Sequence, residues 1–171
     1  MRILVAGVGN LLRGDDGFGV EVAHRLQNMT LPAGVTVAET GIGGIHLVQE
    51  ILAGYDAMIV IDVVDRDKSP GTVMVIEPEI ESTEGLSFQQ KMDYLADMHY
   101  TKPSKALMLA QALQILPERS LLVACQPEDA ERYGEGLSHA VEHAVEVAVK
   151  EICTLIDELQ GEAQVKEGLG D

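Results

Sequence analysis

Two adjacent aspartates follow the first apolar run of the chain, and a third aspartate ends a later apolar run. Asp15 and Asp16 stand after the glycine-rich stretch Gly7–Gly14, and Asp62 directly follows Met58–Ile61. A carboxylate at the end of a buried strand must be paired, solvated in a cleft or bound to a metal. Because open α/β folds bind ligands at the carboxyl ends of their strands, the spacing predicts a ligand site at this edge.

The adjacent pair offers more carboxylates than one helix needs. A helical pattern begins at Phe18, and an aspartate just before it can cap the free N–H groups and complement the helix dipole. Such a cap contributes about 1 kcal/mol. One cap is enough for one helix, so one of Asp15 and Asp16 is left over as a candidate ligand.

A histidine is the third candidate group. His99 stands shortly before Pro103, a residue that suits the first turn of a helix. That helix precedes the last predicted strand, so its beginning can lie over the same edge of the sheet. Asp16, Asp62 and His99 together offer two carboxylate oxygens and one imidazole nitrogen. Three such ligands with open positions suit a divalent ion such as zinc, nickel or manganese.

Strands and helices alternate along the chain. Short apolar runs at 3–6, 35–38, 58–61, 73–76 and 121–124 predict five strands. The residues predicted to face the core at helical spacing are Phe18, Val22, Ala23 and Leu26, then Ile45, Val48, Ile51 and Leu52, then Ala106, Leu109, Ala110 and Leu113, and finally Val141, Val145, Ala148, Ile152, Leu155 and Leu159, with Ser138 as the cap of this last helix.

The predicted fold is a three-layer α/β/α sandwich around a five-stranded, mostly parallel sheet. The polar turn 65–71 is too short for a crossover helix, so strand 73–76 is predicted to be antiparallel, as a hairpin partner of the strand before it. Residues 1–160 are expected to form a single domain. The glycine- and charge-rich residues 161–171 are expected to fray.

Composition excludes several classes of function. The chain has 171 residues, with 12 basic and 28 acidic side chains, which gives a net charge of −16. Such a surface repels phosphate backbones, so no nucleic-acid partner is expected. Cys125 and Cys153 are predicted to be small buried residues without a disulfide. The N-terminal apolar run is too short for a secretory signal or a membrane span, which predicts a cytoplasmic protein with no membrane partner.

The glycine-rich stretch does not match a dinucleotide-binding loop. Leu12 occupies the position of the third glycine, and acidic groups at the helix start repel a pyrophosphate. No nucleotide cofactor is therefore expected.

A second histidine motif has the spacing of a zinc peptidase. His139-Ala-Val-Glu142-His143 matches the inverted pattern His-x-x-Glu-His. The apolar positions of this helix lie on its other side, however, and few residues follow that could supply a third ligand. We therefore expect these side chains to lie on a solvated helix face.

The N-terminal pattern is similar to the signature of the hydrogenase maturation proteases, which trim the C-terminal extension of the large subunit of [NiFe] hydrogenases. The matching residues are Gly7, Gly9, Asn10, Leu12, Asp15, Asp16, Gly17 and Gly19, followed by Gly41–Gly44, the strand ending in Asp62, His99, Gln126-Pro-Glu128 and Gly136-Leu-Ser138. The resemblance covers nearly the whole chain apart from the tail.

The resemblance implies that Asp16, Asp62 and His99 contact a metal, and Asp15 is then left to cap the helix and orient its neighbour. The family often has Glu at the first of these positions and an Asp where Thr40 stands. Many relatives also have a different sequence after the histidine. The resemblance further implies that nickel belongs to the substrate, since the precursor is cleaved only after nickel has been loaded.

The sequence therefore predicts an endopeptidase that acts on a nickel-loaded hydrogenase large-subunit precursor. Two alternatives stay open at this point. A phospho-receiver module also has an acidic pair and an aspartate at a strand end, although its acidic pair follows the strand directly. A non-catalytic nickel-binding chaperone could use the same three ligands without cleaving its partner.

Overall fold

The computed structural model describes residues 1–42, 44–78, 80 and 103–168. Its sheet has five strands in the order β2-β1-β3-β5-β4. The strands are β1 (Ile3–Val8), β2 (Val35–Gly41), β3 (Ala57–Val63), β4 (Val73–Ile76) and β5 (Arg119–Cys125). The helices are η1 (Gly14–Gly17), α1 (Phe18–Gln27), α2 (Gly44–Ile51), α4 (Pro103–Ala112) and α5 (His139–Gly168). His99 lies outside the described residues, as does most of the segment between Glu77 and His99.

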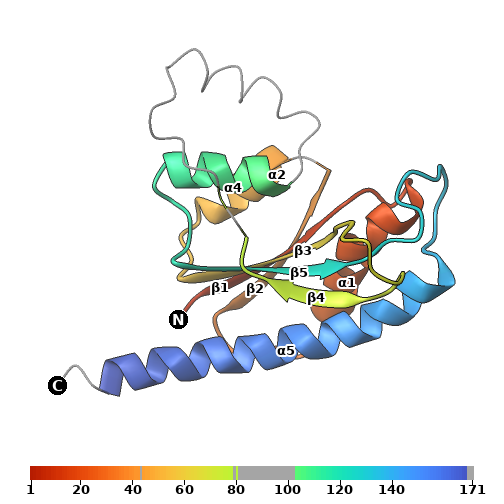
Figure 1. Cartoon of the computed structure of the whole chain (residues 1–171). Coiled ribbons are helices and arrows are strands. Elements are labelled where there is room, and N and C mark those ends of the chain that lie inside the picture. The colour runs from red at the N-terminus through yellow and green to blue at the C-terminus, as the bar shows by residue number, and fades with distance from the viewer. Residues whose placement is uncertain (43, 79, 81–102, 169–171) are drawn as a thin grey trace, which may run out of the picture.

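The sheet is covered by helices on both faces, as Figure 1 shows, with α2 and α4 on one side and α1 and α5 on the other. Alternation along β1 explains the two layers. Ile3 and Val5 pack with α1 and α5, whereas Leu4 and Ala6 pack with α2 and α4. Parallel strands that are buried on both faces have this continuous apolar sequence. The predicted three-layer α/β fold is confirmed.

The antiparallel strand is in the predicted direction but has a different partner. β4 pairs with β5, and β5 lies between β4 and β3. β5 pairs with β3 along its whole length, from Ala57–Arg119 to Val63–Cys125. The predicted hairpin between β3 and β4 is therefore wrong. The more buried strand, β5, occupies the inner position, and the half-exposed β4 forms the edge.

Three residues predicted to face the core are exposed instead. Ile45 is 44% exposed, Leu52 is 60% exposed and Leu113 is 51% exposed. Leu52 and Leu113 follow the last residues of α2 and α4, where helical spacing no longer determines the direction of a side chain, and Ile45 is in the first turn of α2. In α2 the buried position is taken by Leu47.

The last helix is longer than predicted. α5 continues past Gly161 to Gly168, and Glu162 lies 3.6 Å from Arg119 in an ion pair. Residues 162–164 are good helix formers, so the helical pattern does not end at the glycine. The division of the chain at residue 160 stays a prediction. No helix in the described part of the chain is long and apolar enough to cross a membrane.

A glycine lets α1 lie close against the sheet. A Cβ atom built on Gly19 would meet the carbonyl oxygens of Val8 and Ile61, and neither strand can move aside. We expect Gly19→Ala to lower the free energy of unfolding by about 3 kcal/mol, because overpacking against backbone cannot be relieved by a rotamer change. Urea titration measures this loss.

The matched control is Gly161→Ala in α5, where a Cβ atom would have no heavy-atom neighbour within 4 Å. That change should stabilise the helix by about 1 kcal/mol. Equal stability of Gly19→Ala and the natural chain would show that α1 and the sheet do not approach as described.

Candidate functional site

The sheet has a topological switch point between β1 and β3. The chain leaves β1 through α1 on one face to reach β2, and leaves β2 through α2 on the other face to reach β3 (Figure 1). The two connections diverge, which opens a crevice beyond the carboxyl ends of β1 and β3, where ligands bind in open α/β sheets. Asp16 in η1 and Asp62 near the end of β3 both lie at this edge.

Asp62 is a buried carboxyl group that accepts one backbone hydrogen bond within the described part of the chain. It is 7% exposed, and its Oδ1 accepts a hydrogen bond of 2.8 Å from the N–H of Val63. Burial raises the pKa of Asp62 to about 8, the Val63 N–H opposes this rise, and the Asp16 carboxylate adds to it. Asp62 therefore holds a proton at neutral pH in the absence of a cation.

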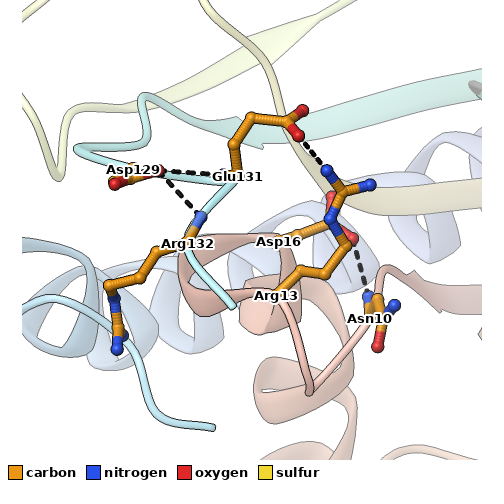
Figure 2. Close-up of polar contacts among 6 residues, drawn as sticks. All are labelled: Asn10, Arg13, Asp16, Asp129, Glu131 and Arg132. Carbon is orange, nitrogen blue, oxygen red and sulfur yellow. Dashed lines mark hydrogen bonds and ion pairs between the residues drawn. The ribbon is translucent and has the colours of Figure 1, made fainter. Parts of the chain in front are cut away.

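Asp16 is half-buried and faces the loop after β1. Its Oδ2 accepts a hydrogen bond of 2.9 Å from the N–H of Asn10 (Figure 2). Burial raises the pKa of Asp16, while the Asn10 N–H and the Arg13 guanidinium lower it. The structure brings β3 and η1 into contact, and with them the predicted site residues Asp62 and Asp16, so the charge of Asp16 disfavours ionisation of Asp62. Their functional role stays a prediction.

Asp15 does not cap the helix that follows it, contrary to the prediction. The caps of η1 and α1 make no side-chain hydrogen bond. The Asp15 carboxylate instead accepts bonds from the N–H groups of Glu128 (2.8 Å), Asp129 (3.0 Å) and Ser138 (2.6 Å). Asp15 thus ties η1 to the loop after β5.

Ser138 completes this cluster. It was predicted to cap α5 with its side chain, but its hydroxyl donates to Asp15 over 3.0 Å, and its carbonyl oxygen accepts the N–H of Glu142. Burial raises the pKa of Asp15, yet the bonds from Ser138, Asp129 and Glu128 outweigh burial and lower the pKa overall. Asp15 is therefore an ionised structural acceptor beside the candidate ligand Asp16.

Gln126, which the sequence showed only as part of the family resemblance, has a structural role at the site that was not predicted. Its Oε1 accepts the N–H groups of Arg66 (2.7 Å) and Lys68 (3.2 Å), and its Nε2 donates to Asp65 over 2.9 Å. This 5%-exposed side chain holds the loop after β3 against the end of β5. The available signal was its position, since it follows an apolar run directly, as Asp62 does.

The loops after β1 and β5 also lie side by side. Arg13 forms an ion pair with Glu131, and Figure 2 shows this contact beside the turn in which Asp129 accepts the N–H groups of Glu131 (3.0 Å) and Arg132 (2.9 Å). An isolated β-bridge joins Arg13 to Gly134. The loops that surround Asp16 are therefore connected by both backbone and side chains.

Two other predicted features are settled by their surroundings. Thr40, which stands where the resemblance places an Asp, is buried and donates to the carbonyl of Gly7 over 3.1 Å. Burial raises the pKa of the Cys125 thiol to about 12, so this cysteine is not a nucleophile at neutral pH. Cys153 is half-buried rather than buried.

The third predicted ligand, His99, lies outside the described residues. Within residues 1–42, 44–78, 80 and 103–168, no three His, Cys, Asp or Glu side chains gather where they could hold a metal ion. The two described carboxylates therefore need a further group to complete a three-ligand site.

Comparison with known proteins identifies the family. A family model described as hydrogenase maturation protease matches residues 20–155. The chain belongs to the hydrogenase maturation proteases. This maturation protease is 33% identical over 151 residues to the hydrogenase expression/formation protein HupD of Rhodobacter capsulatus, covering 88% of this chain and 69% of that protein. It is 32% identical over 169 residues to HoxM of Azotobacter vinelandii, covering 98% and 78%.

A solved structure agrees with this family assignment. The hydrogenase maturating endopeptidase HybD from E. coli superposes with a TM-score of 0.73 at 26% identity, over 92% of this chain and 93% of that one. The resemblance and the enzyme class are confirmed, so the alternatives of a phospho-receiver and a non-catalytic chaperone are wrong. This maturation protease processes the C-terminus of the [NiFe] hydrogenase large subunit. The family acts on nickel-loaded large-subunit precursors.

Proposed function

We propose that this maturation protease recognises the nickel of its precursor substrate through Asp16, Asp62 and His99, and cleaves the C-terminal extension at that site. The observation that carries the proposal is the pairing of two partly desolvated carboxyl groups, Asp16 and Asp62, at the switch point of the sheet. Two carboxyl groups in such a place repel one another unless a cation or a proton lies between them.

The position of α4 supports His99 as the third group. α4 leads into the start of β5 and packs on α2, so its first turn points to the carboxyl edge of the sheet (Figure 1). Alternation along β3 places Asp62 on the same face as Met58 and Val60, which pack with α2 and α4. His99 stands four residues before Pro103, and four residues span at most about 14 Å.

The chemistry follows from the charge states of the two carboxyl groups. The nickel of the substrate supplies a positive charge that favours ionised ligands and polarises a neighbouring carbonyl. Asp62, protonated in the free enzyme, loses its proton when that charge arrives. One of the two carboxylates then accepts a proton from the attacking water and passes it to the leaving amine. Three protein ligands leave coordination positions free for the ligands that the nickel ion brings with it.

The setting of this reaction is inferred from charge and thiol chemistry. Cys125 and Cys153 are both free thiols, which is typical of proteins in a reducing compartment. We therefore place the processing in the cytoplasm. The net charge of −16 supports a protein partner and argues against a nucleic acid.

The decisive experiment is to mix the purified protein with the large-subunit precursor, loaded with nickel or free of it, and follow trimming on a gel. Trimming is expected only with the loaded precursor. We expect His99→Ala to slow it by at least about a hundredfold, because a ligand of the reacting site is lost.

The control is His143→Ala, which removes an exposed histidine of α5. It should trim at the natural rate. If Asp62→Ala and His99→Ala both trimmed normally, the site assignment would be wrong while the family activity would stand.

A further inference from the structure

Two histidines in the first turns of α5 face one another. The Nε2 atoms of His139 and His143 are 3.3 Å apart, and the rings meet edge to face with centroids 4.5 Å apart. Both side chains are exposed, as predicted for the outer face of this helix. The proteolytic proposal makes no use of this pair.

The separation of the two nitrogens suits a shared metal ion. Imidazole nitrogens lie about 2.0–2.1 Å from a bound zinc ion. Two such bonds at an octahedral or tetrahedral angle separate their nitrogen atoms by about 2.8–3.4 Å. The pair can therefore direct both lone pairs at one ion by side-chain rotation, and the exposed rings have room to rotate.

The charged groups nearby also suit a cation. Glu142 lies between the two histidines in sequence and is exposed on the same helix, whereas the charge of Glu146, one turn later, is compensated by Arg25 at 2.8 Å. The net charge of −16 adds a long-range attraction for cations.

We propose that His139 and His143 form a two-ligand surface site for a divalent transition ion of the nickel, copper and zinc group. Imidazole suits all three ions. Two protein ligands leave the remaining positions to water or to a donor from another molecule, so the bound ion is exchangeable. The site is a chelate without peptidase chemistry, because the described residues supply no third ligand to it.

This site is separate from the candidate proteolytic site. α5 covers one face of the sheet, and α2 and α4 cover the other (Figure 1). Alternation along β3 places Asp62 on the face covered by α2 and α4. The proposal therefore stands or falls independently of the assignment of Asp16, Asp62 and His99.

Calorimetric titration of the full, untagged chain with nickel chloride tests the proposal. We expect His143→Ala and His139→Ala each to weaken binding at this site by about a hundredfold, because the second imidazole acts as an intramolecular ligand. The matched control His46→Ala removes an exposed histidine that has no histidine one turn away, and it should bind as the natural chain does.

Histidine ring resonances in NMR assign the bound ion. Those of His139 and His143 should broaden together on adding nickel, in the natural chain and equally in Asp62→Asn. The proposal is overturned if the affinity is unchanged in His143→Ala, or if nickel broadens other residues and leaves this pair sharp. Loss of nickel binding in Asp62→Asn alone would place the ion at the proteolytic site and would equally overturn it.

Discussion

Replacing Asp62 with asparagine is expected to abolish processing of the precursor and, at the same time, to stabilise the folded chain at neutral and alkaline pH. Processing is lost because asparagine can neither carry the charge nor take up the proton that the proposed chemistry requires. Stability is gained because the natural carboxyl group is buried and must either hold a proton or bear an uncompensated charge.

The direction of the pH dependence follows from the raised pKa. Between the ordinary value of 3.8 and the folded value of about 8, the unfolded chain has Asp62 ionised while the folded chain keeps it protonated. Folding then takes up a proton, so Asp62 makes the free energy of unfolding fall as pH rises through this window. The asparagine variant lacks this fall, so its advantage should grow from pH 4 to pH 8.

Urea titrations of both proteins at several pH values measure this difference. Asp157→Asn, which changes an exposed aspartate of α5, serves as the matched control and should show no comparable trend. A constant difference between Asp62→Asn and the natural chain across the window would mean that Asp62 is ionised throughout, and the account of its burial would be wrong.

Replacing Asp15 with alanine is expected to cause the largest loss of stability among the polar changes. The substitution leaves the N–H groups of Glu128, Asp129 and Ser138 without their acceptor. We expect the free energy of unfolding to fall by about 3 kcal/mol, because donors that lose a charged partner bear the cost of desolvation. Processing should slow as well, since the same carboxylate holds the loop beside Asp16.

The pH dependence of this loss is opposite to that of Asp62. The folded pKa of Asp15 is lowered, so its stabilising contribution is present above its ordinary pKa of 3.8 and is lost as pH falls through the folded value. The natural chain and Asp15→Ala should therefore converge in stability under acid conditions. Ser138→Ala, which removes one hydroxyl donor, should cost only about 1 kcal/mol. An Asp15→Ala variant no less stable than Ser138→Ala would show that the hydrogen-bond cluster contributes little.

Local sequence patterns predicted the strands and, within the candidate site, the position of Asp62. An apolar run followed by a single charged residue was enough to place Asp62 at the end of a buried strand, because burial and chain direction are both local properties. The direction of β4 followed in the same way from a short link. Its partner did not, because the partner depends on which strand competes better for the centre of the sheet.

The role of Asp15 could not be predicted because its partners are distant. Local capping rules consider only the helix that follows, whereas Glu128 and Ser138 lie 113 and 123 residues further along the chain. The structural role of Gln126 was missed for the same reason, since its bonds to Arg66 and Lys68 span 60 and 58 residues. Such long-range polar contacts leave no periodic signal in the sequence.

Two of the buried polar side chains, Asp15 and Gln126, give the carboxyl edge a rigidity that regular secondary structure does not provide there. One joins η1 to the loop after β5, and the other joins the loop after β3 to the end of β5. The entropy of ordering these loops is therefore lost when the chain folds, before any precursor arrives. A large protein substrate can then bind without ordering these loops, so their loss of conformational entropy does not weaken its affinity.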